Sequence, residues 1–308
     1  MMVIGGLANV LSLVIVLLGV AYFVIIERKG LGTVQLRQGP NKPTVAGLLL
    51  PVADGLKLLS KEWVVPIAAN QILFLAGPIF VFFFAYSLWL VYPVSHPMMY
   101  FKLSALYFLC MSSVKVFGVI MCGWSSNCQY GLLGAMRAAA QSVSYEVGFS
   151  TLMLCPLLYL GSFELYEVRM DGGIFFISCL EVFFMWFVSA LAETNRTPFD
   201  FVEGESELVS GYMVEYGAFG FTLLVLAEYG SIMFISVLTS VLFFSVFPDF
   251  YMVGDFVVTC IAVFISYLFI VVRGTLPRYR YDKLMELCWK VVLPLAVAFF
   301  MISMVVGL

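Results

Sequence analysis

The sequence predicts an all-α polytopic membrane protein with eight transmembrane helices and amphipathic interfacial helices in the loops of one membrane face. Of its 308 residues, 63% are hydrophobic and only 11% are charged, whereas an average soluble domain is about 45–50% apolar and about 25% charged. Long stretches carry no charge at all, and the charged residues gather in a few loops. This composition excludes a soluble globular enzyme, a disordered chain and a collagen-like chain.

The first four spans follow from apolar stretches of the length that a bilayer requires, about 20 residues. Met1–Ile26 carries no charge and lacks the basic start and the A-x-A-like cleavage site of a signal peptide, so we expect a retained helix. Val64–Phe101 is also free of charge and contains the second span. Leu103–Met121, which encloses Lys115, gives the third span, and Val143–Leu160 gives the fourth.

The last four spans lie in Ile174–Ala192, Tyr216–Phe247, Phe256–Val272 and Val291–Leu308, and Pro248 ends the long sixth stretch. The whole chain, 1–308, is expected to form a single integral membrane domain. The expected helices cover about 2–26, 69–92, 103–123, 143–161, 174–192, 216–245, 255–273 and 290–308.

The basic residues predict the orientation of these spans. Thirteen of the 16 Lys and Arg residues lie in the loops 27–68, 122–142, 193–215 and 273–290, whereas only Lys102 and Arg169 lie in the alternate loops. Short loops rich in Lys and Arg stay on the inner side of the membrane. The long basic loops therefore face the cytoplasm of a bacterium or the matrix of a mitochondrion, and both termini lie on the opposite side.

The chain lacks the sequence patterns of a redox cofactor site. Its seven cysteines form no C-x₂-C pair, although iron–sulfur clusters need closely spaced thiolates. The single histidine, His96, cannot supply both axial ligands of a haem. A Rossmann G-x-G-x-x-G and a Walker P-loop are also absent from the sequence. We therefore expect no cofactor bound by this chain alone.

An acidic segment, 192–215, stands out on the otherwise basic inner face. Its sequence, AETNRTPFDFVEGESELVSGYMVE, has a net charge of −5. Crowded carboxylates bind protons more readily than isolated ones, so the segment can take part in proton transfer. The alternative is a solvated acidic loop with ion pairs to its neighbours. The acids are Glu193, Asp200, Glu203, Glu205, Glu207 and Glu215, and Arg196 is the one base.

Three more acids, Glu146, Glu181 and Glu228, lie within or at the edge of expected spans. A charge at the bilayer centre costs about 2.5–3.5 kcal/mol on insertion scales, so such residues usually face the bundle interior and mark ion or proton paths. Lys115 is the only base inside a span. A structural ion pair between Lys115 and Glu181 is the simplest account of those two residues.

The first inner loop predicts an amphipathic helix at the membrane interface. Its apolar residues at helical spacing are Leu49, Val52, Leu56 and Leu59, and the opposed charges are Asp54, Lys57, Lys61 and Glu62. A basic cluster beside it, Arg28, Lys29 and Arg37, could dock an acidic protein or hold a polar headgroup.

Five segments resemble the subunit 1 family of NADH dehydrogenase, the quinone-chamber membrane subunit of respiratory complex I. The segments are Glu27-Arg28-Lys29, QLRQGPNK, GWSSNCQYGLLGAMRAAAQSVSYEV, AETNRTPFDFVEGESELVSGYMVEYG and LPRYRYDKLMELCWK. The match runs from the first span to the last. The missing transit peptide and the end of the chain directly after the last span resemble the mitochondrially encoded type.

The resemblance implies eight helices, a tunnel through which ubiquinone enters, and a glutamate-rich path that couples quinone reduction to proton translocation. Lys115 and Glu181 stand outside the family pattern. The resemblance further implies that ubiquinone is the substrate and that FMN and iron–sulfur clusters are bound only by partner subunits. It also implies a multi-pass protein of the mitochondrial inner membrane, with termini on the intermembrane-space side. The expected partners are peripheral-arm subunits on the matrix side, small membrane-arm subunits and lipids, but no nucleic acid.

The resemblance also assigns site residues, and no residue of the chain is expected to be catalytic in isolation or to bind a metal. The expected quinone-tunnel residues are Arg28, Arg37, Asp54, Lys57, Arg196, Phe199, Asp200, Phe221 and Arg273. The expected coupling path consists of Glu27, Glu62, Arg137, Tyr145, Glu146, Glu193, Glu203, Glu205, Glu207, Glu215 and Glu228.

Three alternatives stay open at this point. The chain could be the equivalent subunit of a membrane-bound hydrogenase-type complex, a stand-alone cation or proton transporter, or a membrane anchor without a catalytic part. The long basic inner loops suit permanent docking to partners better than free-standing transport.

Overall fold

The computed structural model describes residues 2–42, 46–93, 101–171, 175, 179–201, 210–245 and 251–306. These ranges contain helices, turns and loops and no β-strand, so the predicted all-α class is confirmed. The helices are α1 (Met2–Val34), α2 (Leu50–Ser60), α3 (Gln71–Ser87), η1 (Leu88–Val91), α4 (Ser104–Ser125), α5 (Gln129–Leu160), α6 (Leu165–Asp171), α8 (Leu180–Glu193), η2 (Gly211–Met213), α10 (Ala218–Phe243), α11 (Tyr251–Thr275), α12 (Tyr281–Leu287), η3 (Cys288–Val292) and α13 (Leu293–Val306).

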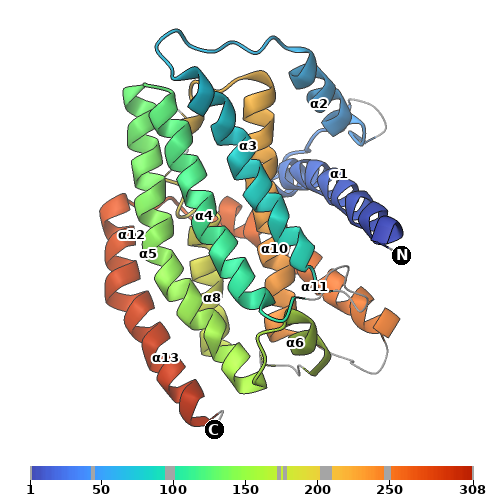
Figure 1. Ribbon diagram of the computed structural model, residues 1–308, viewed down its shortest axis with the longest axis vertical. Helices are drawn as coiled ribbons and strands as arrows, with labels where there is room; N and C mark the ends of the chain where they lie inside the picture. Colours follow the sequence, from blue (N-terminus) through green and yellow to red (C-terminus); the bar gives the residue numbers. More distant parts are fainter. Residues whose placement is uncertain are drawn as a thin grey trace.

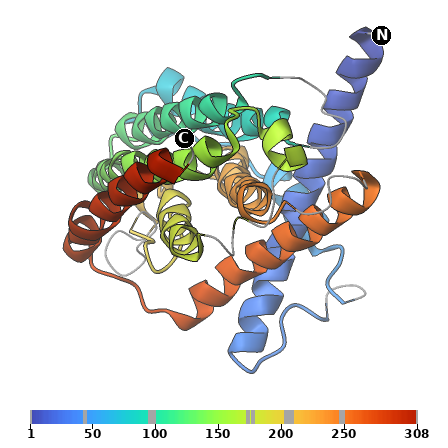
Figure 2. The same ribbon diagram turned by 90° about the horizontal axis from the view of Figure 1, so that it is seen from below.

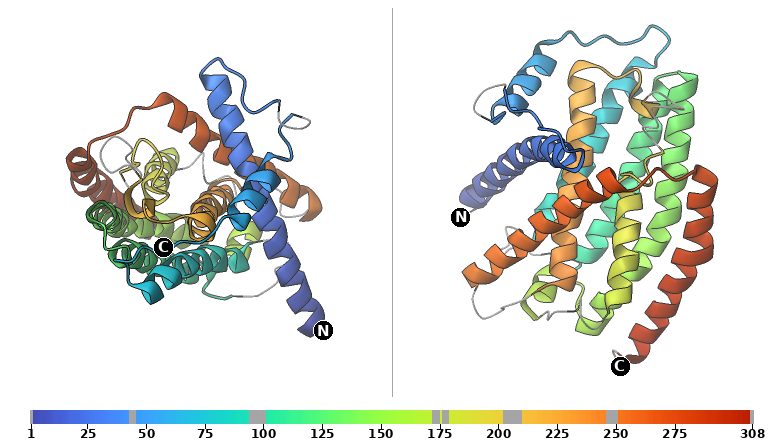
Figure 3. Two further views of the ribbon diagram at one scale, coloured as in Figure 1. Left: turned by 90° about the horizontal axis from the view of Figure 1, so that it is seen from above. Right: turned by 180° about the vertical axis from the view of Figure 1, so that it is seen from behind.

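Helix α10 occupies the middle of the bundle, with α3, α4, α5 and α8 running alongside it (Figures 1 and 2). Helices α1 and α11 are inclined across the bundle and pack against each other and against α10 (Figure 3). Small residues allow this crowding: Gly230 of α10, for example, faces the ring of Tyr86 on α3. Helix α10 is therefore well placed to carry side chains that several other helices reach.

Seven helical segments of the described ranges are long and apolar enough to cross a membrane. They are α1, α3 with η1, α4, α5, α10, α11, and the continuous run from α12 to α13. The expected fifth span, 174–192, coincides in its later part with α8, of which 14 residues are described. Residues 172–174 and 176–178 lie outside the described ranges, so an eighth span stays a prediction.

The expected inner loop 122–142 is mostly helical, which differs from the sequence prediction. Helix α4 continues to Ser125, and α5 begins at Gln129 and runs for 32 residues without a break. Small residues explain the difference, because Gly123 lies so close to α5 that an added Cβ would clash with Ala135. Gly134 approaches the backbone of η2 in the same way. Close helix packing thus continues beyond the apolar stretch that hydropathy detects.

Two other helices also extend beyond their expected spans. Helix α1 reaches Val34 instead of ending near residue 26, because its buried Glu27 finds partners within the protein. The last helix begins at Tyr281 instead of residue 290, and an exposed Glu286–Lys290 pair, 2.8 Å apart and one turn from each other, supports it. Charged residues end the membrane-embedded part of these helices without ending the helix.

The interior is closely packed and aromatic, whereas the outer surface is apolar. Trp186 of α8 is fully buried and stacks on Phe149 of α5, with ring centroids 4.2 Å apart. On the outside, large apolar side chains such as Ile15, Phe83 and Phe264 are exposed. Such a surface suits contact with lipid tails, as the composition predicts.

Candidate functional site

Helix α2 lies beside α1 and α10 at one end of the bundle (Figure 1). The predicted amphipathic helix is present: its apolar residues Val52 and Leu56 are exposed on the outside of the protein, whereas Leu59 borders the space between α2, α1 and α10. Its Pro51 stands in the first turn, where proline favours helix initiation. Because its apolar face points outward, α2 can rest on the lipid surface while its other side faces the bundle.

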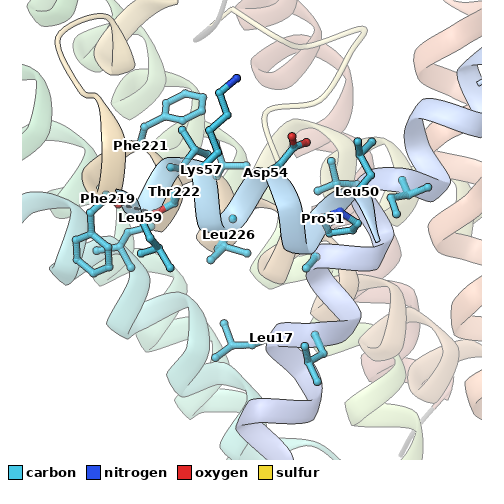
Figure 4. A pocket seen from close by; sticks show the side chains of 18 of the residues that line it. Leu17, Leu50, Pro51, Asp54, Lys57, Leu59, Phe219, Phe221, Thr222 and Leu226 are labelled. Atoms are coloured by element: carbon cyan, nitrogen blue, oxygen red, sulfur yellow. Dashed lines mark hydrogen bonds between the residues drawn. The ribbon is translucent and has the colours of Figure 1, made fainter. Parts of the chain in front are cut away.

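An open cavity of about 590 Å³ lies between α1, α2 and α10. Its wall is almost entirely apolar; the charged members are Arg28, Asp54 and Lys57. Figure 4 shows the Asp54 and Lys57 side chains pointing away from Leu17 and Leu226, so these charges lie at one end of an apolar space. Arg28 and Asp54 are joined by an ion pair of 3.4 Å, and both side chains are about half exposed. We refer to this space as the access cavity.

Beside the access cavity, three distant segments meet at one buried carboxylate. Glu27 of α1 is only 4% exposed. It pairs with Arg196, which follows α8, at 3.0 Å, and with Arg273 near the end of α11. We call these three residues the arginine clamp. The clamp ties the beginning of the acidic segment to the first and seventh predicted spans.

Burial and charge act in opposite directions on Arg196. Burial has the largest single effect and lowers the pKa of its guanidinium, but the Glu27 carboxylate, Tyr229 and the Glu228 carboxylate together raise it by more, so the pKa stays above the ordinary value of arginine. The guanidinium also lies over the ring of Tyr229, 4.4 Å from the ring centroid. Arg196 is therefore a permanent positive charge at the start of the acidic segment.

From the arginine clamp, a row of acidic and basic groups continues through the bundle. The charges that act on Glu228 of α10 include those of Arg196 and Lys115. Those that act on Glu193 are Lys115 and Glu146. Hydroxyl groups bind two of the acids: Tyr212 donates to Glu228 at 2.8 Å, and Ser113 of α4 donates to Glu146 of α5. The structure thus brings together acids that are scattered along the sequence. We call Glu27, Arg196, Glu228, Lys115, Glu193 and Glu146 the charged row.

The expected ion pair between Lys115 and Glu181 is wrong. Lys115 points into the bundle and donates to Ser231 Oγ at 3.1 Å, and its acidic neighbours are Glu193 and Glu228. Glu181 lies on the exposed side of α8. Lys115 shares a small cavity with Glu193, at the end of α8, whereas Glu181 lies in the first turn of that helix, about 18 Å away at a rise of about 1.5 Å per residue. The two residues therefore differ in depth as well as in the face on which they lie.

The family model described as NADH dehydrogenase matches residues 7–304. The chain belongs to the NADH dehydrogenase family. The NADH-ubiquinone oxidoreductase chain 1 of Aedes aegypti is 45% identical over 292 residues, which cover 94% of this chain and 92% of that protein. The protein of the same name from Heterololigo bleekeri is 46% identical over 310 residues, which cover 99% and 98%. That from Bradypus variegatus is 44% identical over 300 residues, covering 95% and 93%. The predicted family is confirmed.

The residues that the family resemblance assigned to a quinone tunnel fall into separate places. Four of them, Arg28, Asp54, Lys57 and Phe221, line the access cavity, and Arg196 and Arg273 belong to the arginine clamp. Phe199 is buried, and its ring lies between those of Tyr145 and Tyr279. Asp200 is half-buried near Glu228. Arg37 is exposed and donates to Gln35 at 2.7 Å, so it stands apart from the others.

The expected coupling-path residues of this NADH dehydrogenase family member are also divided. Glu146, Glu193 and Glu228 belong to the charged row, whereas Glu27 belongs to both the row and the clamp. Tyr145 is fully buried and donates to the Leu284 carbonyl at 3.2 Å, so its hydroxyl joins α5 to α12. The remaining positions are Glu62, which is exposed, and Arg137 and Glu215, which are half-buried. Glu203, Glu205 and Glu207 lie outside the described residues.

The sequence did not reveal the polar partners of the row. Tyr212, Ser113, Tyr229 and Ser231 each contact a charged member of it. Tyr229 follows Glu228 directly and Ser231 comes three residues after it, and this proximity to an acid inside a span is the sequence feature that points to them. Serine and tyrosine are common in membrane helices, so composition alone could not single out these four.

Proposed function

We propose that the chain is the membrane subunit of a mitochondrial NADH:ubiquinone oxidoreductase, complex I, that admits ubiquinone and couples its reduction to proton translocation. Partner subunits hold the FMN and the iron–sulfur clusters, and this chain supplies binding and coupling. The observation that carries the proposal is the position of an apolar cavity directly beside a buried row of charges. The names of its relatives support the same assignment.

The access cavity suits the isoprenoid tail of a quinone. Its volume of about 590 Å³ lies within the range of about 300–1,000 Å³ that is usual for ligand sites. Each CH₂ group of the tail that leaves water contributes about 0.8 kcal/mol to binding. Because α2 rests on the membrane surface, a lipid-borne tail can pass between α1 and α2 without crossing water. The polar head then meets Arg28, Asp54 and Lys57 at the charged end.

The charged row suits the transfer of an electrostatic change or of protons. Reduction of a quinone by two electrons must be balanced by two protons, so negative charge develops near the site before protons arrive. A unit charge about 4 Å from another interacts with it by roughly 4 kcal/mol at an effective dielectric constant near 20. Arg196 is held beside Glu27 and acts on Glu228. A charge change at the clamp therefore shifts the proton occupancy of Glu228, and from there that of Glu193 and Glu146.

In this proposal the subunit works only within its complex. The inner loops dock the quinone-binding part of the peripheral arm on the matrix side, and the apolar outer surface contacts lipids and neighbouring membrane-arm subunits. The termini face the intermembrane space.

Filling the access cavity tests its role. Ala21 lines the cavity, whereas Ala53 lies on the exposed side of α2 and does not line it. In the intact complex we expect Ala21→Phe to raise the KM for long-tailed ubiquinone and to leave NADH:ferricyanide activity unchanged. Ala53→Phe, the matched control, should change neither. Equal KM values for both variants would remove the cavity from the quinone path.

Replacing one acid of the row tests the coupling role. Glu228→Gln keeps the size of the side chain and removes its charge, so we expect slow quinone reduction and impaired proton pumping with iron–sulfur centres intact. Glu286→Gln is the control, because Glu286 is exposed and paired with Lys290. Normal coupled pumping in the Glu228 variant would count decisively against the path. Proton transport by the purified chain in vesicles would favour a stand-alone transporter instead.

A further inference from the structure

Two hydrogen bonds link Lys115 of α4 to the backbone of Glu228 on α10, one of the acids of the charged row. Its ammonium group donates to Ser231 Oγ at 3.1 Å. Ser231 Oγ in turn donates to the backbone carbonyl of Glu228 at 2.8 Å. The chain of two hydrogen bonds joins the middle of α4 to the middle of α10.

A small cavity lies on the other side of the ammonium group. It has a volume of about 20 Å³, and its polar lining residues are Ser112, Lys115, Ser142, Glu193 and Asn195. A buried water needs about 10–15 Å³ and two to four polar partners, so one water molecule fits there.

Two acceptor atoms of this cavity have unmet hydrogen-bonding capacity. Within the described part of the chain, Glu193 Oε2 and Asn195 Oδ1 are buried and have no hydrogen-bond donor. Buried polar atoms without a partner are rare in folded proteins, and a bound water or ion is one of the explanations for them. An ammonium group has three donors, and Ser231 accepts one of them. The other two are thus available, directly or through one water, to the acceptors of the cavity.

The charges around Lys115 agree with this geometry. The acidic groups that act on it are Glu193, across the small cavity, and Glu228, beyond Ser231. One cation therefore stands between two carboxylates that belong to different helices. A proton that binds to one carboxylate frees the ammonium charge to stabilise the other, so the two acids cannot change charge independently.

We propose that Lys115 is a positioning residue of the coupling path, whose ammonium group and one water of the small cavity join Glu193 and Glu228 into a single charge-sharing unit. This inference rests on the proposed function, because it gives the lysine a role in a path that the carboxylates must form. The proposed path consists of carboxylates and could be drawn without a lysine. The inference adds Lys115 to it as a basic member.

The test uses the intact complex in sealed membranes, with quinone-reductase kcat and KM, proton pumping, NADH:ferricyanide activity and assembly as readouts. Lys115→Met removes the charge and keeps the length, and Lys115→Arg keeps the charge. Lys102→Met is the matched control, since Lys102 is exposed just ahead of α4. We expect Lys115→Met to lower kcat by roughly two- to thirty-fold, the range for a residue that carries coupling. KM for quinone, ferricyanide activity and assembly should stay unchanged, and Lys115→Arg should restore most of kcat.

Several outcomes would overturn the inference. Normal kcat and pumping in Lys115→Met, or an equal loss in Lys115→Arg, would leave no role for the ammonium charge. If Lys115→Met does not assemble, Ser231→Ala decides, because it removes only the bridging hydroxyl; an unchanged kcat there would also overturn the inference. Loss of pumping in Glu228→Gln with none in Lys115→Met would retain the proposed path and reject the lysine, whereas normal pumping in both would reject both.

Discussion

The arginine clamp gives the sharpest prediction for stability. Glu27→Gln leaves two guanidinium groups beside a neutral amide, in a place where the side chain of Glu27 is 6% exposed and that of Arg196 only 12%. Removing one partner of a buried ion pair costs about 3–5 kcal/mol, because the remaining charge stays buried without compensation. In the native protein the Glu27 carboxylate raises the pKa of Arg196 and opposes the effect of burial. In the variant, burial would lower this pKa without that opposition. We therefore expect a strongly destabilised subunit.

The matched control is the ion pair at the mouth of the access cavity. The Arg28 and Asp54 side chains are 52% and 47% exposed, and exposed pairs contribute about 0–1 kcal/mol. The assay is the temperature at which the intact complex loses half of its initial NADH:quinone activity irreversibly, normalised for each variant. We expect a large fall for Glu27→Gln and almost none for Asp54→Asn. Equal shifts in the two variants would refute the view that burial sets the strength of the clamp.

Three further predictions concern packing and the charged row. Trp186 is fully buried, so Trp186→Ala should destabilise the assembled subunit by about 3–5 kcal/mol. Trp289 is 55% exposed, so Trp289→Ala should cost about 0.5 kcal/mol or less. Thermal inactivation of the complex distinguishes the two variants. Gly134→Ala would place a Cβ 2.8 Å from the backbone of η2 and should destabilise the subunit by about 1–3 kcal/mol, which weakens assembly on native gels. Gly55 has open space around it, so Gly55→Ala should assemble normally. Tyr212→Phe removes a 2.8 Å hydrogen bond to a carboxylate, worth about 1.5–3 kcal/mol; a quinone-reductase kcat equal to that of the unaltered complex would contradict its role.

Hydropathy was sufficient to predict most of the fold, because the bilayer demands long apolar helices. The limits of the helices were less predictable. Residues 122–142 carry polar and small side chains that suggest a loop, yet glycine-mediated contacts between α4 and α5 keep the chain helical there. The sequence displays hydrophobicity along the chain, but it does not display how closely two helix backbones approach.

The candidate site was predictable in its acids and less so in their partners. Glu146 and Glu228 could be predicted because a charged residue within a span is energetically costly and therefore indicates a functional position. Both lie in the charged row. The predicted partner of Lys115 was wrong because Glu181 lies at the start of α8, whereas Lys115 lies beside Glu193 at its end; the depth of a residue in the bundle depends on where its helix begins, which hydropathy does not fix. The family resemblance named four residues that line the access cavity, Arg28, Asp54, Lys57 and Phe221, but hydropathy alone could not reveal the cavity, since its walls come from three helices whose arrangement depends on the whole bundle.

The clamp has a consequence for biogenesis. Glu27 is separated along the chain from Arg196 by 169 residues and from Arg273 by 246. During synthesis from the N-terminus, α1 enters the bilayer long before either arginine has left the ribosome. The carboxylate must then stay at the membrane surface, in contact with water, until Arg196 has been synthesised, and its second partner arrives only with α11. Closure of the clamp is accordingly a late event, and a chain that ends after α10 would leave the first helix with only one of its two cationic partners.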